Sequence, residues 1–241
     1  MTSLVHYSLA TNIATITLDD GKRNALSPAM LKQINAAIDR AKKDQAIIVF
    51  TGRDDVFSAG FDLNVMKSSP LNALRMLGAG YALTAKVMAY PYPVIAACNG
   101  HSLAMGVFLM LSTDYIVGTR GNFKISANEV AIGLTMPRVA AAMLRHRLTP
   151  SDYQSAVALA KYYSVDDALK AGFFNELTDA SNLLPKAYEL ADEFAQLSVP
   201  AHTASKRRIR SSLIRYIRFS IPLDLFDALL FGIKTALKSK K

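Results

Sequence analysis

The sequence predicts an α/β domain with parallel strands, followed by a helical extension. Apolar runs at residues 46–51, 94–98 and 115–118 are continuous rather than alternating, which is typical of strands buried on both faces. Segments of helical length separate these runs, and such alternation favours parallel pairing of the strands. From about Pro150 onward only helical patterns remain, so we expect no further strand there.

The elements before residue 150 can be placed in order. Residues 13–18 alternate with period two and predict a first strand. Ser27 and Pro28 suit the N-cap and first turn of a helix, whose apolar face is formed by Leu31, Ile34, Ile38 and Ala41. After the strand at 46–51 we expect a helix over residues 71–88, a strand at 94–98, a buried apolar helix over residues 103–111 and a strand at 115–118.

Composition limits the classes of protein that are possible. The 241 residues are 51% hydrophobic and 20% charged, which is typical of a folded domain with a substantial core. The single cysteine, Cys98, excludes an intramolecular disulfide framework and fits a reducing compartment. The first residues lack the pattern of a secretory signal, and the longest apolar run, at 103–111, is too short to span a membrane. We therefore expect a cytoplasmic protein.

Several kinds of site can be tested against the sequence. It has no glycine-rich nucleotide motif of the Rossmann or P-loop kind. The four histidines have no metal-ligand spacing, so no metal site is expected. Residues 100–104 imitate the nucleophile elbow of serine hydrolases, with Ser102 as nucleophile and His202 as base. Ala104 replaces the final glycine of that motif, which makes a helix N-cap the better interpretation of Ser102.

Two other turns fit together better. Residues 56–63 and 99–106 each follow a buried strand and place backbone N–H groups where a loop enters a helix. Two such donors that converge on one point would bind an oxyanion. On spacing alone, ordinary glycine-bearing turns remain the alternative.

Four segments together resemble the crotonase (enoyl-CoA hydratase/isomerase) superfamily. They are residues 22–26 (KRNAL), 57–63 (FSAGFDL), 93–100 (PVIAACNG) and 128–133 (NEVAIG). The resemblance implies a spiral of repeated ββα units, assembly into trimers or paired trimers, and an acyl-CoA thioester as the substrate. It implies no cofactor beyond that substrate.

The resemblance also assigns roles to residues. It implies that the backbone N–H groups of Phe61 and Met105 form an oxyanion hole and that Glu129 moves a proton. The alternative for Glu129 is a glutamate in a first helical turn, capped by Ser126 or Asn128. The remaining substrate and CoA contacts that the resemblance implies are Lys22, Arg23, Ala25, Ser58, Ala59, Gly60, Asp62, Leu63, Gly106 and Phe108.

The position of Phe108 distinguishes the enzymes of two reactions within the superfamily. Its hydratases carry a second glutamate at this position, and two carboxylates can hold and activate water. We expect Phe108 to face Glu129 across the acyl chain and exclude water, which favours conversion of 3-enoyl-CoA to 2-enoyl-CoA by one glutamate. The alternatives are a 2-enoyl-CoA hydratase of weak activity, or an acyl-CoA- or RNA-binding homologue without turnover.

The net charge of +9 lies mostly at the C-terminal end. Residues 201–241 contain ten basic and two acidic side chains, whereas residues 1–200 are nearly balanced. We place a boundary near residues 198–200, between a core of residues 1–197 and a basic helical extension of residues 198–241. The extension has two predicted apolar stripes: Ile209, Leu213 and Ile217, and Phe226, Leu229, Leu230, Ile233 and Leu237.

The basic residues of this extension allow three interpretations. Residues 206–210, with Arg215 and Arg218, could bind the phosphates of CoA or contact another subunit. They could also form a solvated helix face. Nucleic-acid binding is the least favoured of the three, because no aromatic residues of the single-strand-binding kind are interleaved with them.

Overall fold

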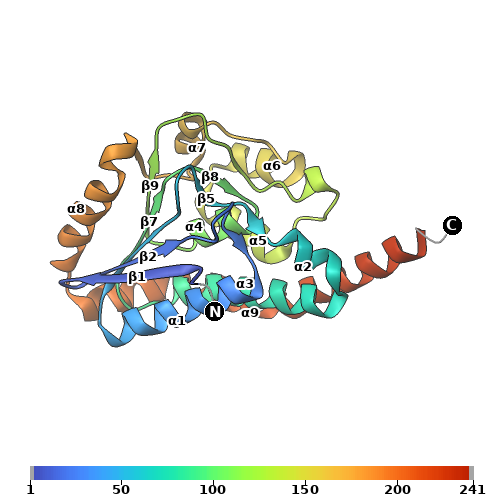
Figure 1. Cartoon of the computed structure of the whole chain (residues 1–241), viewed down its shortest axis with the longest axis horizontal. Coiled ribbons are helices and arrows are strands. Elements are labelled where there is room, and N and C mark those ends of the chain that lie inside the picture. The colour runs from blue at the N-terminus through green and yellow to red at the C-terminus, as the bar shows by residue number, and fades with distance from the viewer. Residues whose placement is uncertain (1–2, 239–241) are drawn as a thin grey trace.

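The computed structural model describes residues 3–238, with side chains through residue 233 (Figure 1). Its strands are β1 (Val5–Ala10), β2 (Ile13–Leu18), β3 (Ala25–Leu26), β4 (Ile47–Thr51), β5 (Val56–Ser58), β6 (Gly60–Phe61), β7 (Val94–Cys98), β8 (His101–Leu103), β9 (Tyr115–Thr119), β10 (Ile125–Ser126) and β11 (Glu176–Thr178). Its helices are α1 (Pro28–Lys43), α2 (Leu63–Ser68), α3 (Pro70–Met88), α4 (Met105–Leu111), η1 (Val130–Ile132), α5 (Arg138–Arg147), α6 (Pro150–Leu159), α7 (Val165–Ala171), η2 (Ala180–Asn182), α8 (Leu183–Ala195) and α9 (Val199–Lys238).

The main sheet has the strand order β1-β2-β4-β7-β9-β11. Strands from β2 onward pair in parallel, and β1 alone in this sheet pairs antiparallel, with β2. A second sheet has the order β10-β8-β5, and β3 pairs with β6. The predicted α/β class with parallel strands is confirmed.

The two kinds of sheet are built by a repeated unit. In each turn of the chain a strand of the main sheet is followed by a strand of a smaller sheet and then by a helix: β4, β5 and α3; β7, β8 and α4; β9, β10 and α5. This is the spiral of ββα units that the resemblance predicted. Because each turn stacks on the previous one, the loops after β5 and β8 lie next to each other.

Helices cover both faces of the main sheet, which explains the continuous apolar strands. On one face Ile47 and Val49 pack against Leu190 and neighbouring apolar residues of α8. On the other face Ile48 and Phe50 belong to the larger core, which includes α1, α3 and α4. Strand β4 therefore has no solvent-facing side.

The first helix follows its sequence signals. The Ser27 hydroxyl oxygen accepts a hydrogen bond from the backbone N–H of Met30 at 3.2 Å, and Pro28 occupies the first turn. The predicted face of Leu31, Ile34, Ile38 and Ala41 is buried. Both the start and the orientation of α1 are confirmed.

Two predictions about elements were wrong. The buried helix predicted over residues 103–111 begins only at Met105, because residues 101–103 form β8 in the second sheet. A strand, β11, also lies beyond Pro150 and extends the main sheet beside β9. Three residues are too few to show a periodicity, so only pairing with β9 makes this segment a strand.

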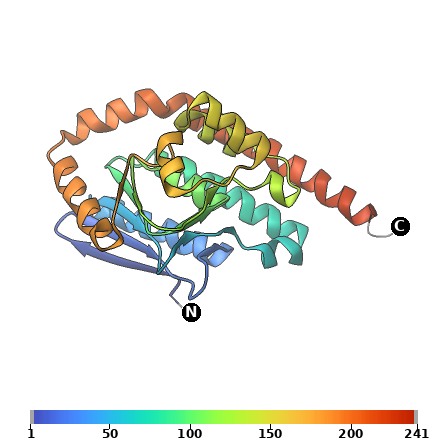
Figure 2. The same ribbon diagram turned by 90° about the horizontal axis from the view of Figure 1, so that it is seen from above.

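Helix α9 packs against α3 and α5 and projects beyond the rest of the fold (Figures 1 and 2). Its predicted first stripe is partly wrong: Ile217 is fully buried, but Ile209 is 67% exposed. The second stripe is exposed at Phe226, Leu229, Leu230 and Ile233, and Leu237 lies outside the described side chains. The face of α9 that packs against the core differs from the prediction because two charged residues in its N-terminal half, Lys206 and Arg210, are buried there.

Lys206 and Arg210 form that contact with Asp114, which follows α4. Lys206 Nζ lies 2.6 Å from Asp114 Oδ2, and Arg210 Nη1 lies 2.8 Å from Asp114 Oδ1. Both cationic side chains are about 6% exposed. They therefore fasten α9 to the core and are not available to phosphates, which corrects the CoA-binding interpretation for these two residues.

No helix within the described residues is both long enough and apolar enough to cross a membrane.

Candidate active site

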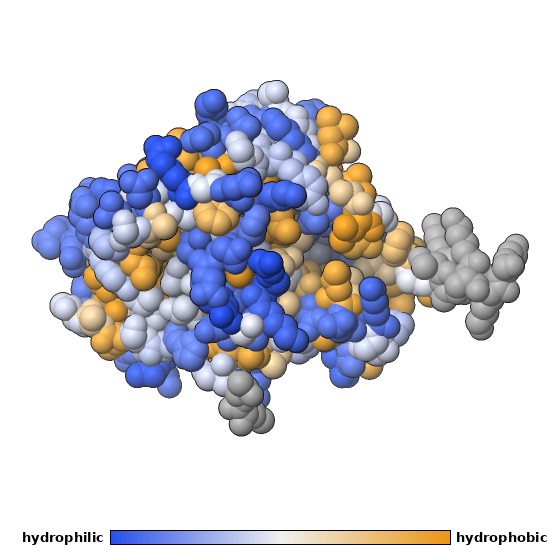
Figure 3. All heavy atoms as spheres, turned by 45° about the horizontal axis from the view of Figure 1, so that its top comes forward, coloured by the Kyte–Doolittle hydropathy of each residue, from blue (hydrophilic) through white to orange (hydrophobic). Residues whose placement is uncertain are grey.

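A cavity of about 290 Å³ opens between α2, α3, the segment after β10 and α9. Apolar surface gathers on this side of the molecule, next to the projecting end of α9 (Figure 3). The residues that line the cavity are Ala59, Phe61, Leu63, Met66, Leu77, Tyr81, Ala104, Asn128, Glu129, Ile132, Leu134, Thr135, Met136, Pro137, Asp224, Asp227, Ala228 and Phe231.

Glu129 is a buried carboxylate on the wall of this cavity. The residue is 7% exposed, and its Oε2 has no hydrogen-bond partner among the described residues. Burial raises the pKa of Glu129 to about 7, against a smaller opposite effect of its own backbone N–H. A carboxyl group with such a pKa can both accept and return a proton near neutral pH.

The local backbone does not support the structural alternative for Glu129. The residue precedes a short 3₁₀ turn, η1, without a side-chain cap, and Ser126 belongs to strand β10. The Glu129 carbonyl accepts the N–H of Leu134 at 2.9 Å, which holds the loop over the cavity. Glu129 therefore lines the cavity and precedes only a three-residue turn, so it does not stabilise the start of a long helix.

The two predicted donor turns lie in contact. Gly60 has φ +92°, and a Cβ added there would lie 2.9 Å from the Ala104 Cβ and 3.2 Å from the Met105 nitrogen. Met105 is the first residue of α4, so its N–H has no acceptor within that helix. The segments that carry the Phe61 and Met105 N–H groups thus converge at one edge of the cavity.

The turn before α4 is strained. Ala104 has φ 46° and ψ −124°, a conformation that residues with a side chain rarely adopt. Backbone hydrogen bonds hold it: the Ala104 N–H donates to the Ser126 carbonyl at 2.9 Å, and the Ala104 carbonyl accepts the N–H groups of Val107 at 2.9 Å and Phe108 at 3.3 Å. Such strain is found where a backbone group must be aimed at a ligand.

The side chains of both predicted donors are held by α3. The Phe61 ring packs edge-to-face against Tyr81, with 5.9 Å between the ring centroids. A Cβ on Gly80 would lie 2.5 Å from the Phe61 ring and 3.4 Å from the Met105 Cε. Met105 is fully buried and is not among the residues that line the cavity, so its side chain extends into the core.

The loop of residues 22–25 is ordered by Asp20. Its carboxylate accepts backbone N–H groups of Lys22, Asn24 and Ala25 at 2.7–2.8 Å. Burial opposes the charge on Asp20, but these hydrogen bonds hold its pKa below the ordinary value. Lys22 and Arg23 are exposed on this loop, and Arg23 lies 3.4 Å from Asp55.

The other predicted contact residues fall into two groups. Ala59 and Leu63 line the cavity. The others position the backbone around the cavity: they are Ser58, Asp62 and Gly106. The Ser58 hydroxyl donates to the Asn24 carbonyl at 2.7 Å, and Asp62 caps α2. A Cβ at Gly106 would lie 2.5 Å from the Ser58 carbonyl oxygen, so the two backbone segments approach each other closely there.

Phe108 requires a correction. It is 1% exposed and packed in the hydrophobic core, and it is not among the residues that line the cavity. Helix α4 is enclosed on every side, so an aromatic ring on it is stabilised by the core. The aromatic residues on the cavity are Phe61, Tyr81 and Phe231.

The cavity also contains residues that sequence reasoning did not identify. Tyr81 is buried, and burial together with the nearby charges of Glu129 and Asp224 raises its pKa. Asp224 lies on α9, and its carboxylate accepts a hydrogen bond from the backbone N–H of Val139 on α5, 85 residues away in the sequence. A contact over such a distance leaves no periodic signal in the sequence.

The serine-hydrolase alternative fails on geometry. Ser102 lies in strand β8 and is fully buried, and its hydroxyl has no hydrogen-bond partner within the described residues. The predicted base, His202, lies on α9 and lines a different cavity, with Pro93 and Phe194. Over the described residues no three histidine, cysteine or acidic side chains are grouped so that they could hold a metal ion.

A buried carboxylate and two converging backbone segments around an apolar cavity define a site suited to proton transfer on a carbonyl compound. Residues 9–219 match the enoyl-CoA hydratase/isomerase family, and the chain belongs to that family.

Similar proteins include both hydratases and isomerases. A probable enoyl-CoA hydratase of Mycobacterium tuberculosis is 42% identical, with a TM-score of 0.91 over 98% of this chain and 99% of that one. A second structure of the same Mycobacterium tuberculosis protein, described there as an enoyl-CoA isomerase, is 43% identical, with a TM-score of 0.88 over 92% of this chain and 97% of that one. The peroxisomal enoyl-CoA delta isomerase 1 of Arabidopsis thaliana is 27% identical over 82% of this chain and 84% of its own length.

Proposed function

We propose that this protein converts 3-enoyl-CoA to 2-enoyl-CoA thioesters, with Glu129 as the only acid–base group. The observation that carries the proposal is the unpartnered Oε2 of Glu129 in an apolar cavity, on a carboxyl group whose pKa burial raises to about 7. In the forward direction Glu129 takes a proton from C2 of the substrate. It returns the proton to C4 as the double bond moves to C2–C3.

The negative charge that forms on the thioester oxygen needs hydrogen-bond donors. The N–H groups of Phe61 and Met105 are proposed to supply them, since their segments meet beside the cavity. Loss of one such donor typically costs about 10²–10³ in rate. The loop with Lys22 and Arg23, and the cavity wall at Ala59 and Leu63, are proposed to bind the CoA part.

Hydration would need a second group to hold and activate water. Two further carboxylates line the cavity, Asp224 and Asp227, but both already have partners. Asp224 accepts three hydrogen bonds from Arg138 and Val139, and Asp227 forms an ion pair with Arg138. Because these two carboxylates are committed to Arg138 and Val139, Glu129 has no second carboxylate beside it to activate water, and isomerisation is favoured over hydration.

The proposal is tested by assaying 3-enoyl- and 2-enoyl-CoA side by side, with wild-type protein and Glu129→Gln. We expect isomerisation in the wild type and a loss of about 10²–10⁴-fold in the variant, with CoA-ester binding retained. Hydration faster than isomerisation would contradict the proposal and favour a hydratase. Binding without turnover of either substrate would favour a non-catalytic homologue.

We also propose that the protein assembles into trimers or paired trimers. The support is the exposed apolar residues on α9, such as Phe219 (70% exposed) and Phe226 (58% exposed), which a second copy could cover. Light scattering on the purified protein tests this. The cytoplasmic location stays a prediction.

A further inference from the structure

Tyr81 on α3 lines the active-site cavity, although the residue is only 3% exposed. Its hydroxyl group forms no hydrogen bond within the described part of the chain, and its oxygen is not sealed from solvent. The hydroxyl therefore opens onto the cavity, where water satisfies it before a substrate binds. A ligand that expels this water would leave a buried donor without an acceptor, which is costly.

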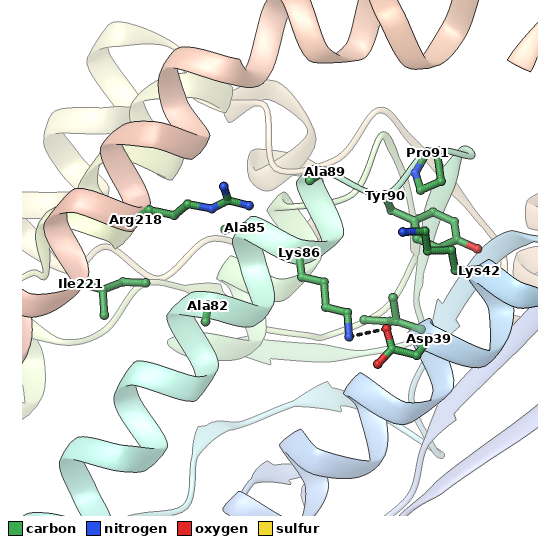
Figure 4. Close-up of a pocket in the computed structure, with 11 residues that line it drawn as sticks. Asp39, Lys42, Ala82, Ala85, Lys86, Ala89, Tyr90, Pro91, Arg218 and Ile221 are labelled. Carbon is green, nitrogen blue, oxygen red and sulfur yellow. Dashed lines mark ion pairs between the residues drawn. The ribbon is translucent and has the colours of Figure 1, made fainter. Parts of the chain in front are cut away.

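The ring that carries this hydroxyl is fixed in place. It packs edge-to-face against Phe61, with 5.9 Å between the ring centroids. Another side of α3 is fastened to α1, because Lys86 Nζ lies 2.8 Å from Asp39 (Figure 4). Lys86 also donates to the carbonyl and side-chain oxygens of Asn35, at 3.2 and 3.1 Å. The Tyr81 oxygen thus has a set position, and its proton turns about the C–O bond to meet an acceptor.

Glu129 on the same cavity wall has the complementary need. Its Oε2 is buried and has no hydrogen-bond partner among the described residues. Burial, and after it the negative charges of Glu129 and Asp224, raise the pKa of Tyr81, so both carboxylates lie near its hydroxyl. Asp224 already accepts hydrogen bonds from Arg138 and Val139. Of these two carboxylates, Glu129 is therefore the one with a free oxygen.

We propose that Tyr81 is a positioning residue, whose hydroxyl donates a hydrogen bond to Oε2 of Glu129 once an acyl group fills the cavity. The inference rests on the proposed role of Glu129 as the base. The acyl group displaces the water that satisfies both side chains, and their pairing removes one unsatisfied donor and one unsatisfied acceptor. Tyr81 keeps its own proton. Because Oε2 has more than one lone pair, the carboxylate can accept this bond and still take the substrate proton.

Other polar side chains on the wall suit this role less well. Asn128 Nδ2 donates to the Tyr162 hydroxyl at 3.4 Å, and Thr135 is exposed to bulk water. Asn128 Oδ1 also has no partner within the described residues, but a neutral amide oxygen is a weaker acceptor than a carboxylate. The hydrogen bond from Tyr81 is therefore expected to go to Glu129.

The charged groups around this pair come from two other helices. Asp224 and Asp227 on α9 line the cavity, and Arg138 on α5 forms ion pairs with both of them. Burial raises the pKa of Glu129 to about 7, so a titration near neutral pH is assigned to this residue. The pH profile of the reaction then reports on any hydrogen bond that Glu129 accepts.

The first test compares the wild type with Tyr81→Phe, which keeps the ring and removes only the hydroxyl. The profile of kcat/KM reports the free protein, and both proteins should share its midpoint near pH 7. The profile of kcat reports the bound state, where the midpoint of the variant should lie about one to two pH units above that of the wild type. The sign follows because a donated hydrogen bond favours the ionised carboxylate, so its loss raises the pKa of Glu129 in the complex. KM should change little.

A second readout needs no turnover and stays valid if the proposed function fails. Titration calorimetry with hexanoyl-CoA at pH 7, in two buffers of different ionisation enthalpy, gives the protons exchanged on binding. Tyr81→Phe should take up more protons than the wild type, and this difference should disappear when both proteins also carry Glu129→Gln. A wild type without isomerase activity that shows the difference would refute the proposed function and still support the hydrogen bond.

Tyr163→Phe is the matched control. Tyr163 is buried, its hydroxyl donates to the Asp152 carbonyl at 3.0 Å, and it does not line the cavity. This variant should lose stability and keep both pH midpoints, whereas Tyr81→Phe should be at least as stable as the wild type because the free protein loses no hydrogen bond. An unmoved kcat midpoint with unchanged proton uptake in Tyr81→Phe would overturn the proposal. A loss of hexanoyl-CoA affinity in that case would assign the hydroxyl to the substrate instead.

Discussion

The carboxylate of Asp224 on α9 accepts the backbone N–H of Val139, in the first turn of α5, at 3.0 Å. Its other oxygen accepts the backbone N–H of Arg138 at 3.0 Å and the guanidinium of the same residue at 3.1 Å. A residue from the C-terminal helix therefore caps a helix of the spiral core, at the wall of the cavity that contains Glu129.

We predict that Asp224→Ala lowers the free energy of unfolding by about 2–3 kcal/mol, since it removes a helix cap and a buried charged hydrogen bond. Asp224→Asn, which keeps one acceptor, should cost less. Chemical denaturation monitored by circular dichroism gives both values. The neighbouring exposed residue Asp227 offers a control, and equal losses for Asp227→Ala and Asp224→Ala would show that capping is not the cause.

The attachment of α9 at Asp114 leads to a second stability prediction. Asp114→Asn would leave Lys206 and Arg210 buried without their counter-charge, which typically costs about 3–5 kcal/mol. Asp166→Asn is the matched control, because Asp166 pairs with Arg120 at the surface and should change stability by less than about 1 kcal/mol. Thermal unfolding of both variants beside the wild type makes the comparison, and similar melting temperatures would refute the prediction.

We predict that ionisation of Glu129 lowers the free energy of unfolding of the protein as the pH rises. Its pKa is about 7 in the folded protein and near 4.5 in the unfolded chain, so the folded state retains a proton that the unfolded state releases. The free energy of unfolding therefore falls by about 3 kcal/mol between these two pH values and then stays level. Glu129→Gln should remove this penalty, so the variant gains stability over the wild type at pH 8 but not at pH 4.5.

Denaturant titrations of the wild type and Glu129→Gln at several pH values test this. Glu193→Gln is the control, because Glu193 is exposed on α8 and has no comparable burial. A stability difference between wild type and Glu129→Gln that does not vary with pH would contradict the assigned pKa.

The same group should control the rate. Because the carboxylate is the proposed base, kcat/KM for isomerisation should rise with pH and reach a plateau above about pH 7, the pKa of Glu129. Measurement of kcat/KM across this range, at constant ionic strength, gives the midpoint. A midpoint near 4.5 would mean that the carboxyl group is solvated during catalysis.

Gly80 offers a way to disturb the proposed oxyanion hole from outside it. In Gly80→Ala the new methyl group would overlap the Phe61 ring, at 2.5 Å, and would be in ordinary contact with the Met105 side chain, at 3.4 Å. We expect kcat to fall by about 10–100-fold, since small misplacements of catalytic groups are costly. Gly78→Ala, on the same helix, meets only a Leu225 methyl group at 3.3 Å and should retain activity. Equal kcat values in the two variants would argue against Phe61 and Met105 as donors.

Local patterns were sufficient for much of the fold. The N-cap at Ser27 and the continuous apolar strand at 47–51 depend on neighbouring residues and on burial, which a sequence records directly. The spiral and the choice of Glu129 as candidate were implied by the resemblance of four segments to the crotonase superfamily, and not by local patterns.

Tertiary structure decided what depends on partners far away in the chain. Strand β11 exists because β9 offers it hydrogen bonds. The inward face of α9 is set by Asp114, whose charge attracts Lys206 and Arg210 and offsets the cost of removing these cations from water. The wall of the active-site cavity differs from expectation for the same reason: Phe108 is packed in the core, whereas Asp224 arrives from the last helix. The sequence by itself determined most of the strands and helices of the core, because their signals are local. Burial of the Glu129 carboxylate, and hence its pKa, arises only when distant apolar residues close around it.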